Sequence, residues 1–202
     1  MARRCAVWLL GVLIIAAPLV AQGRRSKEEA DRFQSKLTKI VAFGNAPAAA
    51  PKSSQSHNTP VTDVEVNSYL RYRAGDQIPA GIVEPELTAL GAGRVAGKAV
   101  VDLDAVRTQK KRGWLDPLGY LTGRLPVTAS GVLTTKDGKG QFQLQSAEIS
   151  GVTIPKSVLQ ELLSYYSKSA ENPEGINMDA PFELPAKIRE IRVGSGTSTV
   201  VQ

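Results

Sequence analysis

Alternation of apolar and polar residues dominates the middle of the chain. In "RVAGKAVVDLD", Val95, Gly97, Ala99, Val101 and Leu103 alternate with mostly polar residues. Successive side chains of a strand point to opposite faces, so this period of two predicts a β-strand with one small, apolar face.

A second strand repeats the pattern. Its inward residues are Leu125, Val127, Ala129, Gly131 and Leu133. The Asp-Gly turn in "KDGKG" predicts a hairpin, after which Phe142 and Leu144 point inward. The change of phase to Ala147 and Ile149 indicates a β-bulge.

Three other segments have helical spacing. Ser26 with Glu29, and Thr62 with Glu65, match the reciprocal capping pattern and predict helices over residues 27–43 and 62–72. The third helix covers residues 155–167, with Pro155 in its first turn. Its apolar stripe comprises Val158, Leu159, Leu162, Leu163 and Tyr166.

The remaining segments complete an α+β fold. Residues 44–60 lack periodicity and predict a flexible linker, whereas residues 82–90 predict an edge strand containing Pro85. Residues 186–202 predict a closing hairpin across Gly194 and Gly196. We therefore expect a curved antiparallel sheet of about five or six strands wrapped on one main amphipathic helix. Residues 61–202 would form this single domain, and residues 24–43 would add an N-terminal helix.

Residues 1–23 have the composition of a secretory signal peptide. Basic Arg3 and Arg4 precede an apolar run over residues 6–20, which ends in small residues. The run is shorter than the roughly 20 residues that span a bilayer, so we predict cleavage, with retention as an anchor as the alternative. The protein is then exported to a periplasm or cell envelope.

Cleavage would also change the charge and the thiol content. The formal net charge of +6 falls to +4 when Arg3 and Arg4 are removed, which leaves a mild preference for anionic surfaces. Cys5 is the one cysteine, so the mature chain forms no disulfide. This favours a bacterial envelope over the disulfide-rich secreted domains of eukaryotes.

The stripe on residues 155–167 must be covered. At about 2 kcal/mol per fully buried large side chain, it offers on the order of 10 kcal/mol. Gly97, Ala99, Ala129 and Gly131 on the sheet either let the helix approach closely or leave a gap beneath it. The residue pattern leaves both interpretations open: a filled core, or a groove for an apolar ligand.

Several of these segments resemble the small periplasmic proteins related to the tubular lipid-binding (TULIP-like) superfamily. The resemblance covers residues 60–202 and depends on "TPVTDVEVNSYL", "VAGKAVVDLD", "LPVTASGVL", "SAEISGVTIPKSVLQELL" and "LPAKIREIRV". It implies a curved antiparallel sheet that wraps a helix and encloses an apolar groove. It also implies that this groove binds lipid acyl chains. By this resemblance the groove residues are Val95, Ala99, Val101, Leu125, Val127, Leu133, Phe142, Leu144, Val158, Leu159, Leu162, Leu163 and Ile191.

A basic and aromatic segment follows the first of these strands. It contains Arg107, Lys110, Lys111, Arg112, Trp114 and Tyr120. Basic residues near an anionic membrane contribute roughly 1 kcal/mol each, and Trp and Tyr favour the headgroup level. The segment is interpreted either as a membrane-docking loop or as a solvated loop whose Trp packs on the domain.

The sequence favours binding over catalysis. The mature chain has no cysteine, and its one histidine, His57, lies in the predicted linker, which excludes Cys-His and Ser-His-Asp sets. We expect no cofactor, no metal site and no nucleic-acid partner. The partner is a lipid or other apolar small molecule, with an envelope scaffold module as the alternative. A two-carboxylate enzyme using Glu84 with Glu86, or Glu148 with Glu161, ranks third. The oligomeric state stays open.

Overall fold

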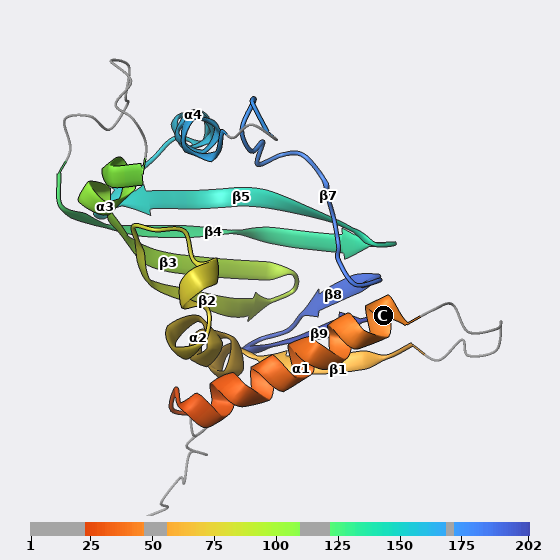
Figure 1. Cartoon of the computed structure of the whole chain (residues 1–202). Helices are drawn as coiled ribbons and strands as arrows, with labels where there is room; N and C mark the ends of the chain where they lie inside the picture. Colours follow the sequence, from red (N-terminus) through yellow and green to blue (C-terminus); the bar gives the residue numbers. More distant parts are fainter. Residues whose placement is uncertain (1–22, 47–55, 110–121, 169–171) are drawn as a thin grey trace, which may run out of the picture.

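The computed structural model describes residues 23–46, 56–109, 122–168 and 172–202 (Figure 1). The helices are α1 (Lys27–Asn45), α2 (Asp63–Tyr72), the 3-10 helix η1 (Gly75–Gln77), α3 (Leu103–Gln109) and α4 (Lys156–Ser167). The strands are β1 (Asn58–Thr62), β2 (Ile82–Gly91), β3 (Arg94–Asp102), β4 (Arg124–Lys136), β5 (Lys139–Ile149), β6 (Val152–Thr153), β7 (Phe182–Glu183), β8 (Glu190–Val193) and β9 (Thr197–Val201).

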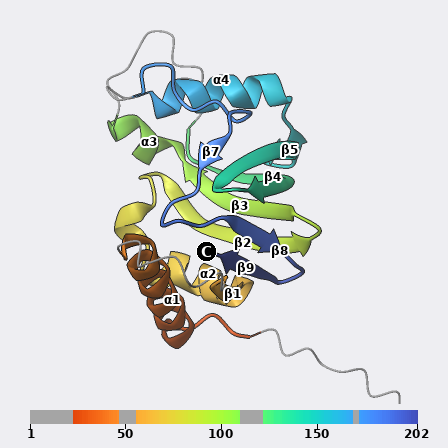
Figure 2. The same cartoon turned by 90° about the vertical axis from the view of Figure 1, so that its right-hand side faces the viewer.

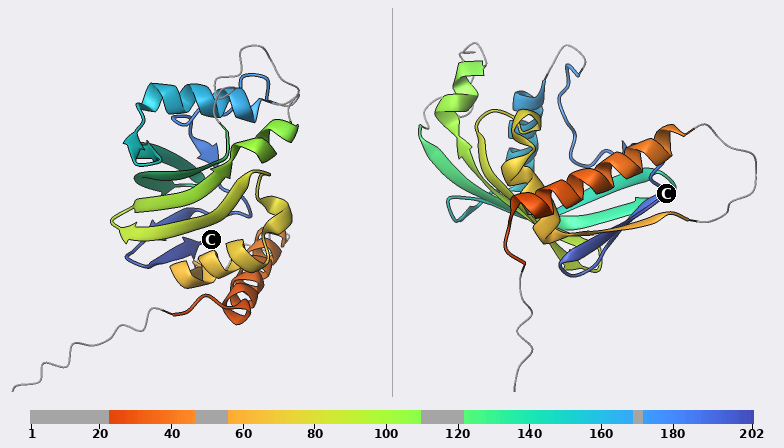
Figure 3. Two further views of the ribbon diagram at one scale, coloured as in Figure 1. Left: turned by 90° about the vertical axis from the view of Figure 1, so that its left-hand side faces the viewer. Right: turned by 60° about the horizontal axis from the view of Figure 1, so that its bottom comes forward.

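Six strands form the larger sheet, which confirms the α+β class. Its order is β2-β3-β4-β5-β6, all antiparallel, and β7 pairs with the beginning of β5. The strand that contains Pro85 lies at the edge, as predicted. The sheet is curved (Figure 3), as expected from strand twist and from the register shifts in β2 and between β4 and β5.

The predicted bulge in β5 is present. Ala129 lies opposite Ala147, whereas Gly131 lies opposite Leu144, so β5 carries an extra residue between these pairs. The bulge moves Ala147 onto the same face as Leu144. One apolar face therefore continues along the whole strand.

A smaller sheet has the order β1-β9-β8 and lies beside the end of the larger one (Figure 2). The predicted closing hairpin forms β8 and β9. The segment assigned to the linker was too long, because its last residues, Asn58 to Pro60, belong to β1. An isolated bridge between Leu90 and Ser195 joins the two sheets. Only long-range pairing reveals β1, since its few residues have no independent periodicity.

Both N-terminal helices begin at the predicted caps. The Ser26 hydroxyl accepts from the backbone N–H of Glu29, and Thr62 and Glu65 form a complete capping box. Phe33 of α1 packs edge-to-face on Tyr69 of α2, with ring centroids 5.1 Å apart. The two helices therefore form one packed unit.

Helix α2 also protects the exposed edge of β2. The Asn67 amide donates to the carbonyl of Leu87 and accepts from its N–H, both at 2.8 Å. The Asp63 carboxylate accepts from the N–H of Ala89 at 3.0 Å. These side chains replace a neighbouring strand, so the edge cannot pair with another chain there.

One local expectation was wrong, and one strand was missed. Leu103, predicted to lie in the strand, is the first residue of α3, because β3 ends at Asp102. The Asp102 side chain accepts from the N–H of Ala105, as a helix-starting carboxylate does. The short strand β7 was not predicted, since two residues are too few for a periodic pattern.

Candidate functional site

The apolar residues of β3, β4 and β5 lie on one face of the larger sheet, here called the inner face. Directly opposed residues on it are Val95 with Gly131, Ala99 with Val127, Val101 with Leu125, Leu133 with Phe142, and Ala129 with Ala147. Opposed residues in an antiparallel pair point to the same side. The structure therefore brings together every β3, β4 and β5 residue that was predicted for the groove.

The inner face is partly open. All eight predicted groove residues of these strands are half-buried, and none belongs to the fully buried core. On the opposite face, Lys98, Thr128 and Gln143 are exposed, as are most of their neighbours. The inner face is thus more protected than the outer face, yet the described residues do not close over it.

A shallow depression of about 290 Å³ lies on the inner face near the edge strand β2. Its lining residues are Ile82, Pro85, Glu86, Leu87, Gly97, Lys98, Ala99, Val101, Val127 and Ala129. Leu87 is 48% exposed, although most of its neighbours here are apolar. An apolar wall that stays wet is a common feature of a binding surface.

The small residues of β3 create this depression. A Cβ atom added to Gly97 would approach only Leu87 Cδ2 at 3.5 Å and the Glu86 carbonyl oxygen at 3.7 Å. Within the described ranges, no helix packs on Gly97. The small residues were expected either to let a helix approach closely or to leave a gap. Around Gly97 the structure supports a gap.

Helix α4 lies along β5, near one edge of the larger sheet, whereas α2 lies at the other edge, beside β2 (Figures 1 and 2). Leu159, Leu162 and Leu163 are half-buried, and Val158 is 43% exposed. Ala147 of β5, at 3% exposure, is the one fully buried apolar residue of β5. The stripe of α4 is therefore only partly covered by the described residues.

The polar side of α4 is fixed by the segment that follows it. The Gln160 amide donates to the carbonyl of Ile176 at 2.9 Å and accepts from the N–H of Met178 at 2.8 Å. Lys156 forms an ion pair with Asp179. These contacts hold the helix in place without using its apolar stripe.

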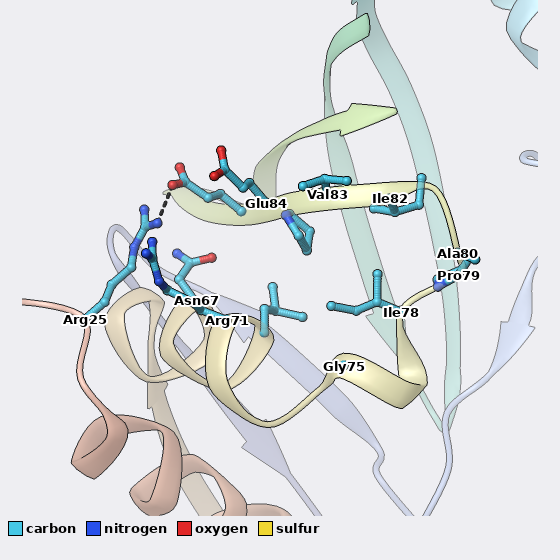
Figure 4. Close-up of a pocket in the computed structure, with 13 residues that line it drawn as sticks. Arg25, Asn67, Arg71, Gly75, Ile78, Pro79, Ala80, Ile82, Val83 and Glu84 are labelled. Atoms are coloured by element: carbon cyan, nitrogen blue, oxygen red, sulfur yellow. Dashed lines mark ion pairs between the residues drawn. The ribbon is translucent and has the colours of Figure 1, made fainter. Parts of the chain in front are cut away.

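A second concavity of about 530 Å³ lies between α2, η1 and the beginning of β2. Arg25, Asn67 and Arg71 lie at one end with Glu84, and Ile78 and Ile82 lie at the other (Figure 4). Leu70, Pro79 and Val83 add apolar wall. We call this concavity the α2–β2 pocket. The α2–β2 pocket has no signature in the sequence, because its residues are brought together by the contact of Asn67 with the edge of β2.

Glu86 is held by two cations beside this pocket. Arg25 forms an ion pair with it, and Lys98 Nζ lies 2.6 Å from its Oε2. Hydrogen bonds from Arg25 and then Lys98 lower the pKa of the Glu86 carboxyl below its ordinary value, in spite of partial burial. A general acid of a glycosidase needs a raised pKa, so this arrangement gives no support to a Glu84–Glu86 catalytic pair.

Several predicted site residues lie elsewhere. Ile191 is in β8 of the smaller sheet, where its backbone exchanges two hydrogen bonds with the Thr135 hydroxyl at the far end of β4. Arg107 lies in α3. The other residues of the predicted membrane-docking loop, Lys110, Lys111, Arg112, Trp114 and Tyr120, are outside the described residues. So are residues 1–22, the predicted signal peptide.

Two further kinds of site, for a metal ion and for a membrane span, concern the described residues. This part of the chain contains no group of three His, Cys, Asp or Glu side chains placed to hold a metal ion. None of its helices combines the length and the apolar character that crossing a bilayer requires.

Comparison with known proteins gave little. No protein-family model matches the chain, and no match was found among curated proteins. Among solved structures, the chain is similar to one described as "Crystal structure of lipopolysaccharide binding protein", with 15% sequence identity and a TM-score of 0.23. The match covers 80% of this chain and 47% of that one, so this chain spans less than half of that protein. At this TM-score the similarity carries no argument about function.

Proposed function

We propose that this is an exported protein of the cell envelope that binds an apolar ligand, of the class of lipid acyl chains, on the inner face of its larger sheet. The observation that carries the proposal is the half-buried inner face, with its depression around Gly97 and its exposed Leu87. Support for export comes from the composition of residues 1–23.

The physical argument is the cost of wet apolar surface. Covering apolar area is favourable by roughly 25 cal/mol per Å², or about 0.8 kcal/mol for each CH₂ group. The inner face combines exposed apolar atoms with few hydrogen-bonding groups, because the depression is lined by Val, Leu, Ile, Pro, Ala and Gly apart from Glu86 and Lys98. A flexible hydrocarbon chain matches this chemistry better than a polar metabolite does.

We propose that the protein binds its ligand and does not catalyse a reaction on it. The carboxylate nearest to the depression, Glu86, is engaged by Arg25 and Lys98, and the polar side of α4 is engaged by residues 176–179. The lowered pKa of Glu86 does not suit a general acid beside the apolar face.

The test is native mass spectrometry of the full chain purified from a bacterial periplasm, followed by organic extraction and lipid analysis. The expected result is a stoichiometric lipid that is lost in Val127→Asp, on the inner face. Thr128→Asp is the matched control, because Thr128 is the next residue of β4 and lies exposed on the outer face.

A second pair protects the test against misfolding. Leu162→Glu changes the stripe of α4, and Ser157→Glu places the same charge on an exposed position in the first turn of that helix. Circular dichroism establishes that each variant is folded. A lipid-free mass with no uptake of added phospholipid would contradict the proposal and favour a scaffold module with a filled core.

Contact with an anionic membrane through residues 107–120 belongs to the same proposal. Its support is the sequence alone, in which Lys110, Lys111 and Arg112 precede Trp114. Sedimentation with anionic vesicles tests it. We expect replacement of these three basic residues by Gln to abolish binding, and unchanged sedimentation would remove the loop from the proposal.

A further inference from the structure

We infer that the α2–β2 pocket binds the polar headgroup of the ligand, and that this headgroup is zwitterionic, with its phosphate at Arg71 and its ammonium group at Glu84. The inference rests on the proposed function, because it supplies the polar end of a molecule whose chain lies on the inner face.

The shape of the pocket fits one end of an amphiphile. Its volume of about 530 Å³ lies within the range of small-molecule sites. Charged and amide groups gather at one end, whereas Ile78, Pro79 and Ile82 form the other (Figure 4). A headgroup attached to a hydrocarbon chain has the same division into polar and apolar parts.

The charges of the pocket are only half paired. Arg25 and Lys98 both engage Glu86, which leaves Arg71 and Glu84 as the other charged residues of the lining. Neither forms an ion pair with any residue of the described ranges, although the Arg71 guanidinium lies 5.8 Å from the centre of the Tyr72 ring, and both residues are exposed. An anion alone would satisfy Arg71 but would lie near the negative Glu84. A group with one phosphate and one ammonium satisfies both.

The backbone at Glu84 gives independent support. Its φ of 50° is in the left-handed region, which glycine adopts without steric cost and Glu does not. Unlike Asp137 and Ala92, which lie in hairpin turns, Glu84 lies in the bulge of β2 between Val83 and Glu86. Strained backbone of this kind clusters at functional sites.

The same bulge connects the pocket to the inner face. Ile82, Pro85 and Glu86 line both the α2–β2 pocket and the depression around Gly97. A molecule with its headgroup between α2 and β2 can therefore continue past this segment onto the apolar surface. The two sites are adjacent subsites for one ligand.

Isothermal titration of the delipidated full chain tests the inference. The probes are dihexanoyl phosphatidylethanolamine, which is zwitterionic, dihexanoyl phosphatidylglycerol, which is anionic, and free phosphoethanolamine, which has no chain. We expect the zwitterionic lipid to bind most tightly and the free headgroup to bind at least a hundredfold more weakly. Equal affinity for free phosphoethanolamine would overturn the assignment to a lipid.

Two variants test the two charges. Arg71→Gln should weaken both lipids about tenfold, the loss of one charge-assisted hydrogen bond. Glu84→Gln should weaken the zwitterionic lipid and shift the preference toward the anionic one. Arg94→Gln and Glu148→Gln are controls, because both residues are exposed on strands and do not line the pocket.

The outcomes separate the two proposals. If both lipids bind, and Val127→Asp abolishes binding while Arg71→Gln and Glu84→Gln do not change it, the headgroup site is wrong and the proposed function stands. If neither lipid binds the wild-type chain, the proposed function fails and the headgroup site fails with it. An unchanged headgroup preference in Glu84→Gln overturns the zwitterionic assignment.

Discussion

Tyr69 of α2 and Leu162 of α4 both lie on the apolar face of an amphipathic helix, yet their surroundings differ. Tyr69 is 7% exposed, packs on Phe33, and its hydroxyl accepts from the Gln77 amide. Leu162 is half-buried beside a sheet whose inner face is open. One helix closes a core, and the other leaves apolar surface available.

The same difference extends to the two regions around these helices. Most of the fully buried apolar residues lie in or against α1, α2 and the smaller sheet, namely Ala30, Ile40, Val61, Tyr69, Ala74, Ala89, Ile188 and Val201. Leu103 and Ala147 are the fully buried ones in the rest of the larger sheet and its connections. The first region therefore holds most of the buried core, and the second leaves apolar surface partly exposed.

The largest expected effect is on the compact region. Tyr69→Ala removes a buried ring and should lower the free energy of unfolding by about 3–4 kcal/mol, as measured by urea denaturation. Tyr72→Ala is the matched control, because Tyr72 lies on the same helix and is 39% exposed. It should cost less than about 1 kcal/mol. Equal losses would show that α2 is not the centre of a core.

Glu65 gives the next largest effect, with a defined pH dependence. It is 4% exposed, and its carboxylate accepts from Lys36 Nζ at 2.6 Å and from the Thr62 N–H at 2.9 Å. Burial acts to raise the pKa of Glu65, but these hydrogen bonds outweigh it, and the pKa lies below the ordinary 4.5.

The sign of the pH effect follows from this lowered pKa. Ionised Glu65 stabilises the fold above pH 4.5, and the contribution disappears as the pH falls through the lower pKa of the folded state. Glu65→Gln should cost about 2 kcal/mol of unfolding free energy at pH 7, and the difference from wild type should shrink below pH 4.5. Glu29→Gln, in an exposed pair with Arg32, should cost less than about 1 kcal/mol. A difference that does not begin to shrink as the pH falls below 4.5 would contradict this role.

The open region should respond more weakly. Leu162→Ala in the ligand-free protein should lower the free energy of unfolding by about 1 kcal/mol, because the side chain is only half-buried. A loss of about 3 kcal/mol or more would mean that the stripe of α4 belongs to a filled core. Added lipid should raise the stability of the wild type more than that of the variant.

Much of this arrangement could be predicted from local patterns. Capping residues Ser26 and Thr62 mark the starts of α1 and α2, and the period of two marks β3, β4 and β5. The shared inner face follows from that period, since a strand has only two faces. These features depend on neighbouring residues, so the sequence contains them directly.

The missed features depend on contacts between distant residues. Strand β1 exists because β9 pairs with it, and the α2–β2 pocket exists because Asn67 binds the edge of β2 twenty residues later. No periodicity encodes either contact. The sequence could not predict whether the inner face is open or filled, for the same reason. Gly97 and Gly131 both occupy an inward position of an alternating strand, although their surroundings differ.

The last comparison uses these two glycines, which share the inner face, and the smallest effect of all is expected at Gly97. At Gly97 an added methyl group would meet Leu87 at ordinary contact distance, 3.5 Å. Gly97→Ala should therefore raise the free energy of unfolding by about 0.5 kcal/mol, because it restricts the unfolded chain without a clash. At Gly131 the added Cβ would clash with the backbone carbonyl oxygen of Gln143 and lie 2.5 Å from the Phe142 ring, so Gly131→Ala should lower the free energy of unfolding by about 2 kcal/mol. Urea denaturation of both variants compares the packing around Gly97 with the packing around Gly131. If Gly97→Ala is as damaging as Gly131→Ala, the depression is filled and the inner face is closed; if it is neutral or stabilising, the space beside Leu87 is open to a ligand.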